Sequence, residues 1–255
     1  MQTAHPVIQS FIDYLKFEKR YSRHTITAYE NDLITFFDYL ETAYDSIPLN
    51  QITHIYVRSW LASLKEEELV SKSINRKISS LKSFFKYQLK VGAIKQTPMA
   101  KIISPKNDKR LPSFVAGKDM ETLFMHVTFP DSFQGRTERL ILMLFYFTGM
   151  RLSELIGLKD NQINFSGSSL KVFGKGNKER IIPANADLLK EIKLYQQEKK
   201  KLELAESGHL IVNEKGKPFN PRVIYSIVKK YLSLITTIEK KSPHVLRHTF
   251  ATHLT

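Results

Sequence analysis

The sequence predicts a mainly α-helical protein of two domains, with a small β-sheet in its second half. Through the first half, apolar residues recur at spacings of three and four, which is the helical period. The second half adds two short segments around a glycine-rich turn, the pattern of a β-hairpin. Prolines and a cluster of charges separate the halves. We therefore expect a helical domain over 1–105, a linker over 106–113, and an α-rich domain over 114–255 that carries a hairpin or three-stranded sheet.

The first half predicts four helices that share one core. Each has its apolar residues on one side, so the four should pack as a small bundle. We expect Ser22 to cap the second helix, Ser71 to cap the fourth, and Gly92 to end the fourth. The predicted segments are 7–19, 22–40, 53–65 and 71–90.

The second half predicts helices around a short hairpin. The helix over 137–148 is apolar on every side, so we expect it at the centre of the domain, ended by Gly149. Ser242 and Pro243 open the last helix. The remaining predicted elements are helices 119–127, 152–158 and 222–234, strands 168–173, 180–183 and 209–212, and a charged surface helix over 186–204.

The composition excludes several classes of protein. With 42% hydrophobic and 11% aromatic residues, and only 10 glycines and 10 prolines, the chain should fold. It has no cysteine, which excludes disulfides, thiolate catalysis and cysteine-based zinc sites. The longest apolar run, 140–147, is far shorter than the roughly 18 residues that span a bilayer. The sequence also opens without a secretory signal, so we expect a cytoplasmic protein that does not bind membranes.

Positive charge dominates the sequence and gathers on the fourth predicted helix. There are 39 Lys and Arg against 25 Asp and Glu, a net charge of +14, which is typical of a protein with a polyanionic partner. Between Ser71 and Arg110 stand 11 basic residues and one acidic residue. At about 100° per residue, one stripe of this helix carries Lys72, Arg76, Ser79, Ser83, Lys86 and Lys90. Such a stripe is either an ordinary solvated face or, as we expect, a surface that lies along double-stranded DNA.

Several residues in the second half could carry chemistry, although each has an ordinary structural explanation. Arg151 follows the buried helix, where a charge needs a partner such as Glu154, and a simple ion pair is the alternative. Lys175 lies between two glycines at the hairpin tip, where exposed lysines are common. One face of the last helix carries His244, Arg247 and His248. A lone histidine there would more often be a core residue.

Together these residue types suit attack on a phosphodiester. Two arginines can hold its non-bridging oxygens through paired hydrogen bonds, which lysine cannot do. A lysine on a hairpin can protonate the leaving oxygen, and a histidine can exchange a proton near neutral pH. We find no carboxylate cluster typical of a two-metal site, so we predict neither a metal nor another cofactor.

Three motifs in this order resemble those of the tyrosine recombinases, also called the phage integrase family, and most closely its Xer branch. They are TGMRLSEL at 148–155, GKGNKER at 174–180 and HVLRHTFATHL at 244–254. The resemblance covers nearly the whole chain. It implies that 1–105 is the helical, SAM-like core-binding domain of the family and that the rest is its catalytic domain.

The resemblance also implies roles for individual residues. Arg151 and Arg247 would clamp the scissile phosphate, and Lys175 would protonate the 5′ oxygen. His244 matches the histidine of the family's H-x-x-R motif, and Glu154 matches an acidic residue that orients the first arginine. The further DNA contacts that we expect are Lys178, Arg180, Arg222 and His248.

The tyrosine nucleophile of the family is missing from its place in the sequence. In the family, a second His or Trp and then the tyrosine follow the H-x-x-R helix. Here all 11 tyrosines precede Arg247, and the last is Tyr231. Tyr225 and Tyr231 lie on a helix whose apolar spacing predicts that they are core residues. We therefore expect the chain to bind DNA without cleaving it, either as an incomplete sequence or as a relative without a nucleophile.

With its tyrosine, such a protein would be a site-specific recombinase that cuts and rejoins DNA through a covalent 3′-phosphotyrosine intermediate. The Xer branch implies chromosome dimer resolution at cell division. The partners would be duplex DNA and like subunits, identical or paralogous, in a tetrameric synapse. A transposon, phage or integron integrase remains an alternative, as does a DNA-binding relative without catalysis.

Overall fold

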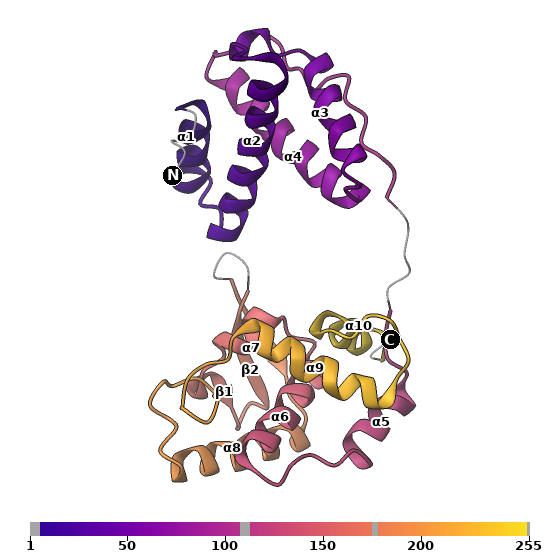
Figure 1. The fold of residues 1–255 in the computed structure, drawn as a ribbon. Helices are drawn as coiled ribbons and strands as arrows, with labels where there is room; N and C mark the ends of the chain where they lie inside the picture. The colour runs from indigo at the N-terminus through magenta and orange to yellow at the C-terminus, as the bar shows by residue number, and fades with distance from the viewer. Residues whose placement is uncertain (1–5, 108–112, 175–177, 254–255) are drawn as a thin grey trace. The chain divides into compact units, whose positions relative to one another are not determined.

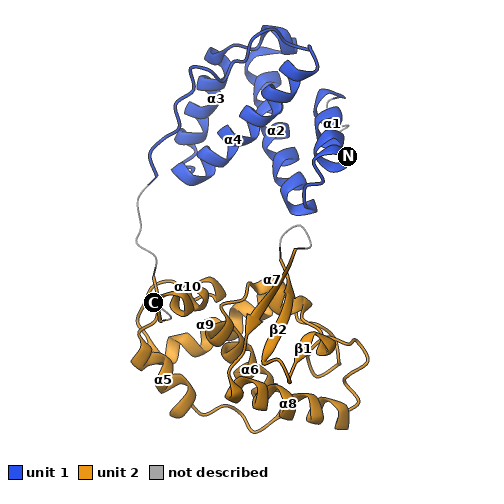
Figure 2. Ribbon diagram, turned by 180° about the vertical axis from the view of Figure 1, so that it is seen from behind, with its two compact units in different colours: residues 1–109 blue, residues 110–255 orange. Residues whose placement is uncertain are grey.

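The computed structural model describes residues 6–107, 113–174 and 178–253, and the chain divides into two compact units. Unit 1 is Met1–Lys109 and unit 2 is Arg110–Thr255 (Figure 2). Unit 1 is helical, and unit 2 combines helices with a three-stranded sheet, so the predicted fold class is confirmed. In the part of the chain that is described, no helix combines the length and the apolar character needed to cross a membrane.

Unit 1 contains the predicted bundle. Its described elements are α1 (Pro6–Asp13), the π-helical turn η1 (Tyr14–Glu18), α2 (Arg23–Tyr44), the 3-10 helix η2 (Leu49–Gln51), α3 (His54–Glu66) and α4 (Ser71–Lys90) (Figure 1). Ser22 caps α2 as predicted, by accepting a hydrogen bond from the Thr25 N–H at 3.3 Å. The predicted cap by Ser71 is wrong. Val70 holds the cap position instead, because its carbonyl accepts from the N–H groups of Ser73 and Ile74.

Aromatic side chains fill the core of unit 1. The ring of Phe36 on α2 lies edge-on to Trp60 on α3, with ring centroids 5.0 Å apart. The ring of Phe11 on α1 meets Phe84 on α4 in the same way at 5.5 Å. Each such pair adds about 0.5–1.5 kcal/mol beyond the burial of its area. Because this core takes the apolar side of α4, the basic side of that helix is left at the surface.

In unit 2, a short antiparallel sheet lies at one side of the helices, with alternate residues of β2 and β3 exposed (Figure 1). The sheet has the order β1-β2-β3, and its register pairs Ser169 with Pro183 and Phe173 with Glu179. The described elements are α5 (Gly117–Met125), α6 (Phe133–Thr148), α7 (Leu152–Gly157), the 3-10 helix η3 (Asp160–Gln162), β1 (Ile163–Asn164), β2 (Ser169–Phe173), β3 (Glu179–Pro183), α8 (Ala186–Lys201), α9 (Pro221–Ile235) and α10 (Pro243–His253).

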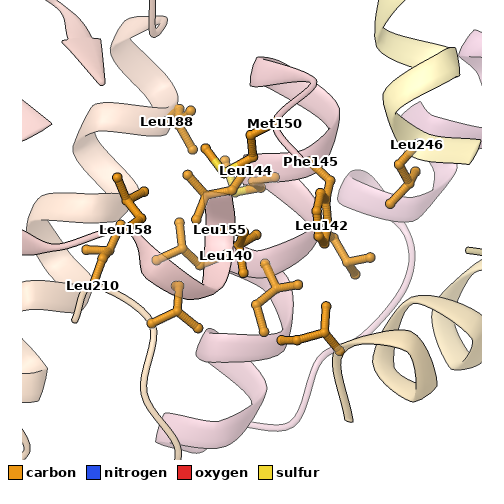
Figure 3. Close-up of a cluster of buried hydrophobic side chains, with 14 of the residues drawn as sticks. Leu140, Leu142, Leu144, Phe145, Met150, Leu155, Leu158, Leu188, Leu210 and Leu246 are labelled. Carbon is orange, nitrogen blue, oxygen red and sulfur yellow. The ribbon is translucent and has the colours of Figure 1, made fainter. Parts of the chain in front are cut away.

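Helix α6 is the central helix that its apolar sequence predicts. Its residues 140–145 are all buried, and α7, α8, α9 and α10 pack against it. Figure 3 shows its leucines among side chains of the neighbouring helices, including Leu155 of α7, Leu188 of α8 and Leu246 of α10. Because residues 140–145 are buried against the neighbouring helices, the residues that follow the C-terminus of α6 start from a fixed position.

The third strand of the sheet is not the predicted one. Residues 209–212 form only an isolated bridge between His209 and Lys159, and the strand beside β2 is β1. The carbonyls of His209 and Leu210 accept hydrogen bonds from Lys199 instead, and the carbonyl of Val212 accepts one from Tyr195. These side chains take the acceptors that a strand ladder would need.

Candidate active site

A sharp turn at the end of α6 presents the first arginine. Gly149 ends the helix in the left-handed conformation, with φ of 55°, and its N–H donates to the Phe145 carbonyl at 3.0 Å. The Phe250 ring of α10 fills the space where a side chain would stand, because a Cβ on Gly149 would lie 2.2 Å from Phe250 Cδ1. The turn places Arg151 directly before α7, with its side chain 53% exposed.

Glu154 holds that arginine from below the surface. Its carboxylate is fully buried, accepting the Arg151 N–H at 2.7 Å and Arg151 Nη1 at 2.8 Å. Arg180 of β3 donates to the same carboxylate through Nη2 at 2.6 Å and Nε at 3.3 Å. Burial by itself would raise the pKa of Glu154, but the hydrogen bonds from Arg180 and Arg151 outweigh it and lower this pKa to about 2. The carboxylate is therefore ionised at neutral pH.

Arg247 of α10 brings a third guanidinium to the same place. Its Nη1 donates to the Gly149 carbonyl, which ties α10 to the turn after α6. Burial lowers the pKa of Arg247, and repulsion by the charges of Arg151 and Arg180 lowers it further. Since arginine stays protonated in proteins, three positive charges lie around the one negative charge of Glu154. The local field favours an anion.

Arg151 and Arg247 line an open hollow of about 430 Å³, which we call the arginine hollow. His244 lines it from the first turn of α10, and its ring lies against that of His248, with centroids 4.7 Å apart. The other lining residues are Met150, Leu152, Ser153, Ile156, Pro221, Tyr225 and Pro243. Two guanidiniums and an imidazole thus open onto a space that a phosphodiester could enter.

Tyr225 also lines the arginine hollow, although its sequence spacing predicts a core position. That prediction is wrong, because its side chain is 46% exposed, whereas Tyr231 is buried as expected. The apolar face of α9 runs through Ile224, Ile227, Val228 and Tyr231, which leaves Val223 and Tyr225 at the surface. If the apolar stripe of this helix is taken to begin at Ile224 instead of Val223, Tyr225 lies outside it and is predicted to be exposed.

The other predicted site residues of unit 2 are more scattered. Lys175 lies outside the described residues. Lys178 and Arg222 are exposed, and His248 is half-buried and is not among the residues that line the arginine hollow. Arg180, expected to contact DNA, is instead paired with Glu154. Within the described residues, His, Asp and Glu side chains form no group of three or more that could hold a metal ion.

The predicted basic stripe of α4 lies at the surface of unit 1. Lys72, Arg76, Ser79, Lys86 and Lys90 are exposed, and Ser83 is half-buried beneath the Tyr29 hydroxyl, 3.3 Å away. A shallow hollow of about 580 Å³ beside Arg76 is lined by residues of α2 that no sequence motif singles out. They are Arg23, His24, Thr27, Ala28 and Asn31. We call these residues and the α4 stripe together the α2–α4 surface.

A buried carboxylate organises the α2–α4 surface. Asp32 of α2 is 1% exposed and accepts hydrogen bonds from three residues of α4. These are Arg76 Nη1 at 2.5 Å, Ser80 Oγ at 2.8 Å and Lys77 Nζ at 3.2 Å. Arg76 is thereby held at the surface by a fixed partner, with its side chain still 51% exposed.

Sequence comparison assigns both units to one family. Residues 114–255 match the model of the phage integrase family, and residues 8–92 match that of the phage integrase N-terminal SAM-like domain. The chain is 35% identical, over 246 residues, to a protein named tyrosine recombinase XerC from Staphylococcus aureus strain bovine RF122 / ET3-1. The alignment covers 96% of this chain and 82% of that protein. The XerC of strain MRSA252 matches at the same identity and coverage.

Solved structures show the same fold at lower identity. The XerH site-specific recombinase bound to palindromic difH substrate aligns with a TM-score of 0.75 and 20% identity, over 97% of this chain and 72% of that one. A λ integrase dimer bound to a core site aligns with a TM-score of 0.71 and 16% identity, over 97% and 84%. The family models and the XerC relatives, together with this shared fold, show that the chain belongs to the phage integrase family of tyrosine recombinases.

Proposed function

We propose that this protein is a site-specific DNA recombinase of the Xer type. The observation that carries the proposal is the convergence of Arg151, His244 and Arg247 on the arginine hollow, although Arg151 is distant in the sequence from the other two. Guanidinium pairs of this kind suit the oxygens of a phosphodiester. The relatives named XerC support the Xer type in particular.

In the proposed reaction, a phosphoryl group moves from a DNA 5′ oxygen to a tyrosine. Arg151 and Arg247 donate hydrogen bonds to the non-bridging oxygens and stabilise the charge that builds up on them. The phenol loses its proton as the new P–O bond forms, and His244 accepts that proton. The bond to the 5′ oxygen breaks, and Lys175 protonates that oxygen, the role that the family resemblance implies. Attack by a 5′ hydroxyl on the 3′-phosphotyrosine reverses these steps and rejoins DNA.

We further propose that these 255 residues bind DNA without cleaving it. Tyr231 is unsuited to attack because its hydroxyl donates to the buried Glu138 carboxylate at 2.6 Å. Burial and this contact with Glu138 raise the pKa of Tyr231. Tyr225 does line the arginine hollow. However, the nucleophile of the family follows the H-x-x-R helix, and no tyrosine follows Arg247 in this sequence.

For unit 1, we propose that the α2–α4 surface lies along the duplex. Its exposed cations suit phosphates, and its short hydroxyl and amide side chains allow close approach to the backbone or the base edges. Lys178 and Arg222 are proposed as further phosphate contacts because both are exposed. In the cell, the proposed complex is a tetramer of like subunits on two duplexes in the cytoplasm, acting in chromosome dimer resolution at cell division.

Binding is tested with the duplex that the 255-residue chain selects from a random library. Arg76→Ala should weaken binding to it by about 5- to 150-fold, which corresponds to the 1–3 kcal/mol of a base or strong phosphate contact. Lys200→Ala is the matched control, because Lys200 is exposed on α8 and belongs to neither the α2–α4 surface nor the lining of the arginine hollow. Equal losses for the two variants would contradict a role for the α2–α4 surface.

Cleavage is tested on a nicked suicide duplex, with denaturing electrophoresis to detect a covalent adduct. The 255-residue chain should give none. A chain extended through a tyrosine beyond the H-x-x-R helix should give one, and Arg151→Ala should abolish it. An adduct mapped to Tyr225 of the 255-residue chain would refute its proposed inactivity. An extended chain that binds but never forms an adduct would favour the DNA-binding relative without catalysis.

A further inference from the structure

Arg180 is engaged inside unit 2 although its sequence position suggests a DNA contact. It lies on β3, opposite Val172 of β2. Its Nη2 and Nε both donate to Glu154, at 2.6 Å and 3.3 Å, and its side chain is only 36% exposed. A guanidinium that uses two of its donor groups on one carboxylate has a fixed orientation.

Glu154 has no accepting capacity left for another partner. A carboxylate offers about four lone-pair sites. Its Oε1 accepts from Arg151 Nη1 and Arg180 Nε, and its Oε2 accepts from the Arg151 N–H and Arg180 Nη2. Because the carboxylate is fully buried, water does not replace a lost donor easily. The position of Arg151 therefore depends on a carboxylate that Arg180 also holds.

The same contact joins the β2–β3 hairpin to the start of α7. The hairpin stem is closed by the Gly174 N–H, which donates to the Lys178 carbonyl at 2.8 Å. Gly174 lies so near the ion pair that a Cβ on it would be 3.5 Å from Glu154 Oε1 and 3.8 Å from Arg151 Nη1. The Arg180–Glu154 pair thus connects the strands on either side of residues 175–177 with the arginine that lines the hollow.

We propose that Arg180 is a positioning residue of the phosphate site and does not itself contact DNA. It holds Glu154 in place, and Glu154 fixes both the guanidinium of Arg151 and the stem of the hairpin. The functional half of this inference rests on the proposed function, since it takes the arginine hollow to bind a DNA phosphate. The structural half concerns the free protein alone.

The structural half is tested by hydrogen exchange of the free chain, followed by mass spectrometry. Arg180→Ala and Glu154→Gln should both speed exchange in the peptides that contain β2 and β3. The control is Lys171→Ala, which removes a half-exposed pair with Glu179 at 2.8 Å between the same two strands and should leave exchange unchanged. Wild-type exchange in Arg180→Ala, or equal acceleration in Lys171→Ala, would overturn the link between hairpin and α7.

The functional half is tested by removing the charge of single phosphates in the selected duplex. Methylphosphonate is placed at each position in turn. The phosphate of interest is the one whose neutralisation weakens DNA binding by the wild-type chain but not by the Arg151→Ala variant. For the wild-type chain, the affinity for the normal duplex exceeds the affinity for the duplex with methylphosphonate at that position. In Arg180→Ala this affinity ratio should fall by about tenfold, which is the value of one hydrogen bond to a charged group. The double variant Arg151→Ala/Arg180→Ala should lose no more than Arg151→Ala.

A direct phosphate contact by Arg180 predicts different results. Its loss would add to that of Arg151→Ala, and it would reduce the slope of log K against log salt by about 0.9, the value for one phosphate. Arg180→Lys would then restore binding because it keeps the charge. In a positioning role it should not, because lysine lacks the paired donors, and this variant also serves if Arg180→Ala does not fold. If the wild-type chain binds no DNA, the proposed function fails while the exchange result still decides the structural half.

Discussion

Lys199 is a buried lysine on a helix whose neighbouring lysines are exposed. It lies on α8 among exposed lysines, in a segment whose charge predicts a surface helix, yet its side chain is 1% exposed. Its Nζ donates to both oxygens of Asp160, at 2.7 and 2.9 Å, and to the carbonyls of His209 and Leu210. It therefore ties α8 to the two segments that the bridge between Lys159 and His209 already brings together.

Loss of this amine should be costly for stability. Lys199→Ala should lower the free energy of unfolding by about 3 kcal/mol, because the carbonyls of His209 and Leu210 lose their donor and Asp160 keeps only its hydrogen bond from Gln196. Lys200→Ala, one position along and exposed, should change it by less than about 0.5 kcal/mol. Urea unfolding monitored by circular dichroism measures both. Similar midpoints for the two variants would contradict the structural role of Lys199.

Glu154 should make stability depend on pH in the acid range. Its pKa is about 2 in the folded chain and 4.5 when unperturbed, so the unfolded state binds the proton more readily. The stabilisation is complete above the unfolded pKa and is lost as pH falls towards the folded one, with an upper limit of about 3 kcal/mol. The stability difference between wild type and Glu154→Gln should therefore shrink on acidification. Glu179→Gln, in a half-exposed pair, is the control, and a difference independent of pH would contradict this account.

At the scale of elements, the junction of α6 and α10 depends on a glycine. Gly149→Ala places a side chain on a left-handed backbone and also in the space of the Phe250 ring. Gly208 has a similar backbone, with φ of 66°, but a Cβ added there would have no atom within 4 Å. Gly208→Ala should cost about 1–2 kcal/mol for the backbone alone. Gly149→Ala should cost clearly more, because the ring and α10 must shift. Thermal unfolding compares the two, and equal losses would show that the contact with Phe250 is unimportant.

The contact between α2 and α4 depends on a buried charge, that of Asp32. Asp32→Asn should destabilise unit 1 by about 3 kcal/mol, because it leaves Lys77, whose side chain is 10% exposed, without its carboxylate. It should also weaken DNA binding, since Arg76 loses its fixed partner. Glu41→Gln changes an exposed carboxylate of the same helix and should do neither. Unfolding and binding measured on the same samples decide this, and a fully stable Asp32→Asn would refute it.

At the scale of the whole molecule, the net charge of +14 should make DNA binding strongly dependent on salt. Each phosphate contact contributes a slope of about −0.9 to log K against log salt, so six contacts would cost about a thousandfold between 50 and 200 mM. Titration of the selected duplex across this range measures the slope. Arg151→Ala, which removes one proposed contact, should reduce its magnitude by about one contact. An affinity that is flat with salt would contradict the proposed DNA partner.

Local sequence patterns were sufficient to predict the two helical units, the central helix α6 and three residues that the structure brings to the arginine hollow. These features depend on short-range periodicity, on glycine and proline, and on motifs that stay together along the chain, all of which are readable without a fold. Arg151, His244 and Arg247 were found in this way because each lies in such a motif.

Which charged and aromatic side chains are free depends instead on tertiary packing. Lys199 is buried, Arg180 is held by Glu154, and Tyr225 is exposed beside the arginine hollow. The partners of Lys199 and Arg180, Asp160 and Glu154, are distant in the sequence, so no local pattern reveals them. A helix also turns its most apolar face towards its neighbours. Periodicity alone did not decide which face of α9 is buried, and packing placed Tyr225 at the surface.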